Sequence, residues 1–189
     1  MADGDRFARA VELIDGANSA AGDLLALEHG RLAAGWVARL DPGADEAQLL
    51  AAQAHHLRRA AVPRSSYPAG RAGYLRWRRD AKARHAAEVG ELLAGVGYGE
   101  DVVGRVQRLV RKEAGEPGAG VHEDAVCLAF LATQLDDLAA ELGEERAVEV
   151  LRKTARKMTP AGLAAAGGLP LSGAGRALLE RALGGGEGA

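Results

Sequence analysis

Histidine and arginine side chains are concentrated in one segment of the chain, between His55 and His85. The segment contains nine basic residues and a single acid, Asp80, so its formal charge is +8. The whole chain has a formal net charge of −2, and the residues outside the segment therefore carry −10. Guanidinium groups bind phosphate and carboxylate oxygens, and imidazoles bind divalent transition metals. The segment indicates an anion held beside a metal or beside proton-transfer groups.

The stretch from Pro63 to Gly73 is expected to be a loop, because its prolines and glycines leave no helical register. Guanidinium forks in such a loop bind oxyanions bidentately, and serine hydroxyls add short donors. Three of the seven aromatic residues lie in the basic segment, and their rings suit stacking on a planar base or sugar. The residues expected to bind the substrate are Arg58, Arg64, Ser65, Ser66, Arg71, Tyr74, Arg76 and Trp77.

A structural interpretation of the same segment stays open. In that case Tyr74 and Trp77 face the core, and the arginines pair with the acidic remainder of the chain. A serine nucleophile at Ser65 or Ser66 is disfavoured, since a hydroxyl nucleophile needs an adjacent base that the sequence does not identify.

Helices must position these groups, because apolar residues recur at helical spacing and no alternation of period two indicates a strand. The pair Thr159 and Pro160 fits an N-cap followed by a first-turn proline. The expected fold class is all-α, with a single helical domain over residues 1–183 and a flexible glycine-rich tail over 184–189. Helices are expected at about 7–16, 23–40, 45–60, 74–94, 100–114, 122–142 and 144–158.

The composition is that of a globular chain rich in helix formers, with 48% apolar and 4% aromatic residues among 189. Its one cysteine, Cys127, excludes an internal disulfide, and its apolar surroundings indicate a small buried hydrophobe. No apolar run approaches the length that spans a membrane, and the first residues do not resemble a secretion signal. We therefore expect a cytoplasmic protein with no membrane partner.

The order of the histidines resembles that of the HD-domain superfamily, all-helical metal-dependent phosphohydrolases. His29 matches the first histidine, LLAAQAHHLRR the helix that ends in a His-Asp pair, His85 the third histidine, and Asp124 the late aspartate. The resemblance implies an HD-domain-like helical bundle with a divalent transition metal such as Fe, Mn, Zn or Ni. It implies metal ligation by His29, His55 and Asp124, with His56 or His85 completing the set. A spare histidine such as His85, or Glu123, is then expected to transfer the proton.

The chain departs from the superfamily pattern at His56, which stands where the aspartate of the pair belongs. An imidazole cannot bridge two metals through one nitrogen, so a single metal ion, or none, follows more readily than two. Adjacent residues on a helix point about 100° apart. Both His55 and His56 can therefore face one site only if the helix frays there.

A second resemblance covers the chain from Phe7 to about Leu183, and it is to the uncharacterised domain of unknown function 4202 family. It rests on AHHLRR, PRSSYPAGRAGYLRWR, the RKE at 111–113 and EDAVCLAFL. This resemblance implies no established activity.

The leading functional hypothesis is a metal-assisted hydrolase of a phosphorylated or otherwise anionic small molecule, with a nucleotide as one example. A second hypothesis is an iron-dependent oxygenase of the HD type, against which the His56 departure argues. A third is a non-catalytic protein that binds an anion, RNA or an acidic partner. The overall acidic charge disfavours nucleic acid.

Overall fold

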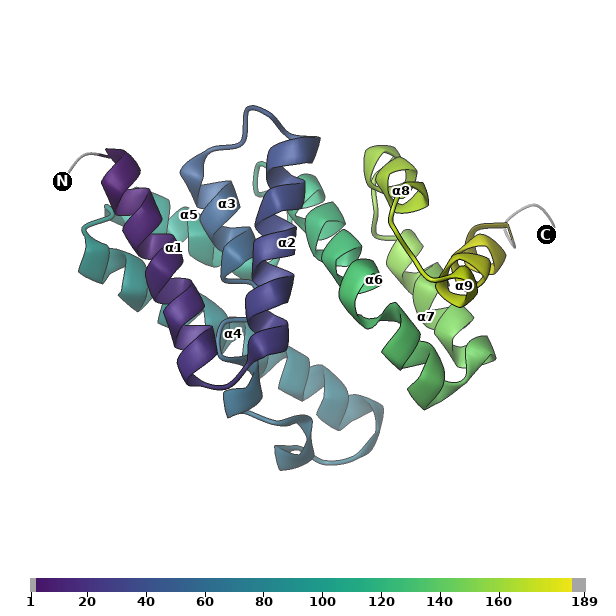
Figure 1. Cartoon of the computed structure of the whole chain (residues 1–189). Coiled ribbons are helices and arrows are strands. Elements are labelled where there is room, and N and C mark those ends of the chain that lie inside the picture. Colours follow the sequence, from purple (N-terminus) through teal and green to yellow (C-terminus); the bar gives the residue numbers. More distant parts are fainter. Residues whose placement is uncertain (1–2, 185–189) are drawn as a thin grey trace.

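A computed structural model describes residues 3–184, which form an assembly of helices without a β-strand in that range (Figure 1). The all-α prediction is therefore confirmed for the described residues. The last five residues of the predicted tail, 185–189, lie outside them. The helices are α1 (Asp3–Ala20), α2 (Leu24–Leu40), α3 (Glu46–Gln53), α4 (Gly70–Val96), α5 (Glu100–Arg111), α6 (Ala119–Leu142), α7 (Glu144–Ala155), α8 (Pro160–Gly167) and α9 (Gly173–Gly184), with short 3₁₀ turns at Arg59–Ala61 and Arg64–Ser66.

Side-chain caps determine where several helices begin. Asp23 accepts a hydrogen bond from the Ala26 N–H at the start of α2, and Asp45 forms a capping box with Gln48 at the start of α3. Thr159 caps α8 ahead of Pro160, as the sequence predicted. These side chains satisfy N–H groups that lack a partner in the first turn of a helix.

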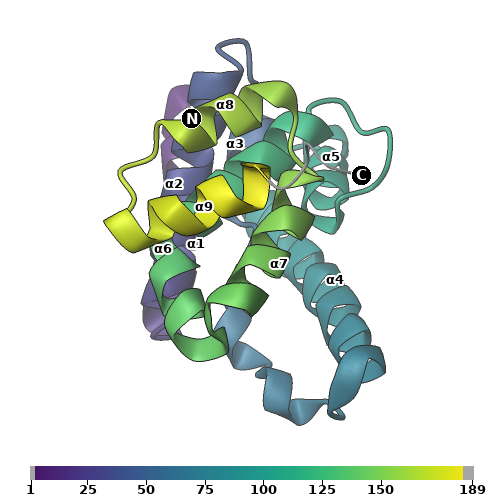
Figure 2. The same cartoon turned by 90° about the vertical axis from the view of Figure 1, so that its right-hand side faces the viewer.

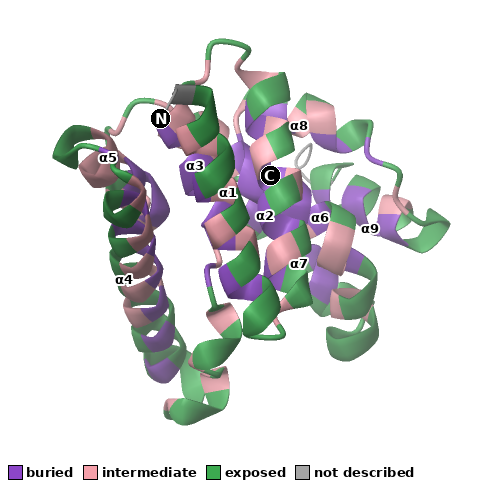
Figure 3. Ribbon diagram, turned by 60° about the vertical axis from the view of Figure 1, so that its left-hand side comes forward, coloured by how far each residue is buried: buried purple, intermediate pink, exposed green. Residues whose placement is uncertain are grey.

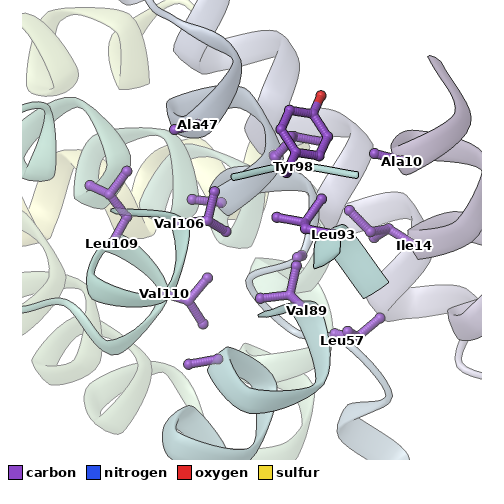
Figure 4. Packing of buried hydrophobic residues seen from close by; sticks show 14 of the residues in the cluster. Ala10, Ile14, Ala47, Leu57, Val89, Leu93, Tyr98, Val106, Leu109 and Val110 are labelled. Atoms are coloured by element: carbon purple, nitrogen blue, oxygen red, sulfur yellow. The ribbon is translucent and has the colours of Figure 1, made fainter. Parts of the chain in front are cut away.

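Two apolar clusters hold the helices together. The first joins α1, α3, α4 and α5 around Ile14, Leu50, Leu93 and Val106 (Figure 4). The second joins α6, α7, α8 and α9, and a smaller third cluster of mostly alanine and valine side chains links α2, α3 and α6 between them. Figure 3 shows that the buried residues face inward along the helices. None of the described helices is both long and apolar enough to cross a bilayer.

Helices α2 and α3 approach each other closely beside the histidines. A Cβ on Gly30 would lie 2.3 Å from the carbonyl oxygen of Gln53, which no side chain at position 30 can accommodate. The glycine thus allows the backbone that carries His29 to lie directly against the end of α3, where His55 and His56 follow.

The third helix ends seven residues earlier than predicted, at Gln53 rather than near 60. Side chains from the α1–α2 corner take its place: Asn18 accepts a hydrogen bond from the Arg58 N–H at 2.7 Å, and Asp23 accepts one from the Ala60 N–H at 2.7 Å. Arg84 donates to the Arg58 carbonyl at 2.7 Å from the other side. Tertiary hydrogen bonds therefore hold residues 54–61 as a turn.

The fourth helix begins at Gly70, earlier than the predicted position near 74, so the expected loop is shorter. The Arg64 guanidinium donates to the carbonyls of Tyr67, Pro68 and Gly70, which closes the chain on itself just before the helix. Figure 2 shows this segment at one end of the molecule, beside the first turns of α4.

We expect the replacement Asn18→Ala to lower the free energy of unfolding by about 1–3 kcal/mol, because it leaves the Arg58 N–H without its acceptor. Urea denaturation measures the change, and Ser19→Ala, at an exposed neighbour, is the control. An Asn18→Ala protein as stable as the Ser19→Ala protein would contradict this account of the turn.

Candidate functional site

All five histidines lie close together where the apolar clusters meet. His29 comes from α2, His55 and His56 from the turn after α3, His85 from α4 and His122 from α6. The ring centroids of His56 lie 4.5 Å from those of His29, 4.6 Å from His55 and 6.3 Å from His85. His122 Nε2 lies 3.3 Å from His55 Nδ1. Because α3 ends before them, both adjacent histidines face the same site.

The surroundings keep these imidazoles uncharged at neutral pH. Burial lowers the pKa of His29 and of His85 to about 4, and that of His122 to about 3. Burial also holds the pKa values of His55 and His56 well below their usual range. The nearby Lys112 cation lowers both further, and Arg59 lowers that of His56. Neutral imidazoles have a free lone pair for a metal or a proton.

Several ring nitrogens lack a well-formed hydrogen bond with a described residue. They are both ring nitrogens of His29, both of His85, and Nδ1 of His122. The backbone of Val126 raises the pKa of His29, and the backbone of Leu57 raises that of His85, but burial outweighs both contributions. Buried polar atoms usually have a partner, so unpaired imidazoles in one cluster point to a ligand that binds there.

A cleft with a cavity volume of about 230 Å³ opens beside the histidines. Its walls come from the turn after α3, from α4, from the end of α5, and from α6 and α7. One part is cationic, with Glu123 as its acid, and the other is apolar. The cations are Arg59, Arg78, Lys112 and Lys157, and the apolar residues include Val126, Phe130 and Val150.

Arg59 stands next to the histidines in the cationic part. Its guanidinium lies 4.7 Å from the centroid of the Trp77 ring, and its Nη1 lies 3.2 Å from His56 Nε2. Trp77 is fixed in turn, because its indole N–H donates to the Val62 carbonyl at 2.9 Å. The stack orients a guanidinium, which carries donors for an oxyanion, towards the cleft.

Lys112 contributes the second cation, from a backbone conformation that is unfavourable for lysine. It ends α5 with φ of 60°, in the left-handed region, and its Nζ lies 2.5 Å from Glu123 Oε2. Among the described non-glycine residues only Arg58 and Lys112 have positive φ, and both adjoin the histidines. Strained residues of this kind occur preferentially at functional sites.

Glu123 is ionised in this environment. Burial by itself would raise its pKa, but the charge and hydrogen bond of Lys112 outweigh burial and hold the pKa below its usual value. Cys127, one helical turn further on, is buried as predicted, and burial raises the pKa of its thiol to about 11. Of these two side chains, the carboxylate is the one able to accept a proton at neutral pH.

The structure separates the predicted substrate-binding residues into two groups. Tyr74 lines the cleft, and Trp77 is buried beneath Arg59. Arg58 lies near Glu88 at 3.9 Å, and Arg64 is bonded to loop carbonyls. Away from the lining of the cleft are Arg58, Arg64, Ser65, Ser66, Arg71 and Arg76.

Asp124, a predicted metal ligand, lies on α6 but not in the lining of the cleft. Its carboxylate accepts hydrogen bonds from the Thr159 N–H at 2.8 Å and from the Thr159 hydroxyl at 2.5 Å. A Cβ on Gly162 would lie 2.3 Å from its Cγ, so α8 packs directly against it. In this structure Asp124 joins α6 to the start of α8.

Residues outside the predicted set of site residues also line the cleft, namely Arg59, Arg78, Lys112, Lys157 and Phe130. All but Lys157 lie within the stretches that supported the family resemblance. Their meeting in one cleft depends on how α4, α6 and α7 pack, which no local pattern reveals.

The fit of a metal depends on the imidazoles. They are neutral nitrogen donors in a protected place, which suits one transition-metal ion. No carboxylate within the described part of the chain joins them to bridge a second ion, since Asp124 bonds Thr159 and Glu123 pairs with Lys112. In residues 3–184, no group of three or more His, Cys, Asp or Glu side chains is arranged to hold a metal ion. Binding one would require the rings to rotate.

The fold and site thus define an all-helical protein with a cationic cleft beside buried histidines. Residues 9–179 match the family described as Domain of unknown function (DUF4202), and the chain belongs to that family. No curated protein and no solved structure gave a match.

We expect the metal-free protein to lose stability as the pH falls from about 6.5 to about 4. In the unfolded chain a histidine binds a proton near pH 6.5, whereas His29 and His85 resist protonation down to about pH 4 in the fold. At pH 5 each of these two histidines lowers the free energy of unfolding by about 2 kcal/mol relative to neutral pH. Urea denaturation of chelator-treated protein from pH 7.5 to 4.5 measures the loss, and equal stability at pH 7.5 and 5 would contradict it.

The left-handed backbone at Lys112 predicts a difference in stability between two variants, both of which lack the ammonium group. Lys112→Gly is expected to be more stable than Lys112→Ala by about 1 kcal/mol, because only glycine adopts this conformation without steric cost. Denaturant midpoints compare the two. Equal stability, or a more stable alanine variant, would show that the backbone at 112 is not strained.

Proposed function

We propose that this protein hydrolyses a phosphorylated or otherwise anionic small molecule bound in the cleft. The observation that supports the proposal best is the juxtaposition, in one cleft, of neutral imidazoles, an ionised carboxylate and four basic side chains. Cations hold an oxyanion and stabilise charge that develops on it, while neutral imidazoles and a carboxylate accept protons. The cavity of about 230 Å³ suits a small molecule.

The cleft residues divide the work in this proposal. Arg59, Arg78 and Lys157 bind and orient the anionic group. Glu123, as a carboxylate paired with Lys112, removes a proton from the attacking water. The apolar side chains on α6 and α7 contact the organic part of the substrate and exclude water from it.

A single divalent metal forms part of the proposal, and His29, His55 and His56 would hold it. When bound, such an ion lowers the pKa of a water and polarises the ester oxygen. We also propose an HD-domain-like arrangement. It is based on the order of these ligands, with His29 on an early helix and His55 and His56 after the next helix. Asp124 would join the ligands only if its hydrogen bonds with Thr159 were broken.

A non-catalytic anion-binding protein is the second candidate. This candidate needs no metal, and within the described range no group of side chains is arranged to hold one. Both candidates use the same cations, so binding alone does not separate them, whereas turnover does.

The test combines metal analysis with a panel of phosphomonoesters assayed with Fe, Mn, Zn or Ni. We expect metal-dependent turnover that falls at least 100-fold in Glu123→Gln, since a positioned proton acceptor contributes about 10²–10⁴-fold. Glu149→Gln, at an exposed position on α7, is the matched control and should keep full activity.

His56→Asn separates the metal from the proton acceptor, because it should lower metal content while Glu123→Gln should not. A protein that binds no metal and turns over no member of the panel would contradict the hydrolase. Bound anion without turnover would establish the second candidate instead.

A further inference from the structure

A second, smaller chamber lies behind Arg59, between α4 and the turn that carries His55 and His56. Its cavity volume is about 40 Å³. It shares Arg59, Arg78 and Lys112 with the cleft, but Lys82 and His85 line only the chamber. Lys157 lines only the cleft, so the sets of lysine and arginine residues that line the two spaces differ by one lysine each.

The chamber is strongly positive. Arg59, Arg78, Lys82 and Lys112 line it, and none of its lining residues is an Asp or a Glu. Glu123, which pairs with Lys112, lines the cleft and not the chamber. Burial lowers the pKa values of Arg59 and Lys82, and neighbouring cations lower them further. Tyr74 and Asp23 oppose the shift at Arg59, and Glu123 opposes it at Lys82. A bound anion would remove this electrostatic cost, whereas a metal cation would add to it.

Donors in the chamber remain available for a ligand. Lys82 Nζ donates to the Arg111 carbonyl at 3.3 Å, and Lys112 Nζ donates to Glu123, so each ammonium group retains two further N–H groups. His85 is 1% exposed, and neither of its ring nitrogens makes a well-formed hydrogen bond with a described residue. A neutral imidazole adds one N–H donor.

The volume restricts what can bind. One water needs a cavity of about 10–15 Å³, so the chamber has room for a few waters or for one small ion, but not for an organic body. We propose that this chamber is a binding site for a free inorganic oxyanion of phosphate size, separate from the substrate cleft. The assignment does not depend on whether the cleft hydrolyses anything.

The probe is inorganic phosphate, titrated by calorimetry into the intact chain. Lys82→Met removes a cation from the chamber alone, and Lys157→Met removes one from the cleft alone. We expect Lys82→Met to weaken phosphate binding at least tenfold and Lys157→Met to change it less than threefold. Circular dichroism checks that both variants fold, and His85→Gln, expected to weaken binding severalfold, supplies a second chamber variant.

Phosphate binding that is absent, that responds equally to both lysines, or that depends on Lys157 alone would overturn the chamber site. Propyl phosphate distinguishes the source of the anion. If it binds together with phosphate, the chamber takes a free ion as proposed, and if it displaces phosphate competitively, the proposal of a separate site is wrong. The protein could turn over esters while Lys82→Met leaves phosphate binding unchanged. That result would refute only this site and would leave the proposed hydrolase intact.

Discussion

The burial of several uncharged imidazoles between apolar clusters is the constraint on which the rest of the site depends. An imidazole in this position is stable only as the neutral form, because burial penalises its charge and the nearby cations of Arg59 and Lys112 repel it. Neutral histidines cannot balance the charges of these cations, and the cleft is lined by four cations and one acidic residue, Glu123. A site of neutral donors beside an excess of positive charge follows from this arrangement.

The hydrogen bonds around residues 54–61 show how the fold maintains that constraint. Asn18 and Asp23, from the α1–α2 corner, bind the N–H groups of Arg58 and Ala60. The turn they hold directs His55 and His56 towards the same site. Left-handed backbone at Lys112 has a similar consequence, since it ends α5 beside the cleft that the Lys112 side chain lines.

Much of the fold could be predicted from the sequence, because apolar periodicity and capping residues are local. The cap at Thr159 is an example, and so is the burial of Cys127. The end of α3 could not be predicted, since the side chains that replace its last turn come from residues about 40 positions away. The same reason explains the cleft, because Arg78 on α4 and Lys157 just after α7 line one cavity although they are far apart in the sequence.

The basic segment and the lining of the cleft overlap only in part. Ser65 and Ser66, before α4, and Arg71, in its first turn, are exposed and lie outside the lining, whereas Arg59 and Arg78 lie within it. Net charge along a sequence does not distinguish a solvated arginine from one oriented by an aromatic ring. The Trp77 stack makes that distinction for Arg59.

A crystal structure of the protein soaked in tungstate, a phosphate-like oxyanion with strong anomalous scattering, would show where an anion binds. We expect an anomalous peak within reach of Arg59, Arg78 and Lys112, beside His56. Peaks confined to the exposed arginines, such as Arg71 and Arg76, with none beside the histidines, would contradict it.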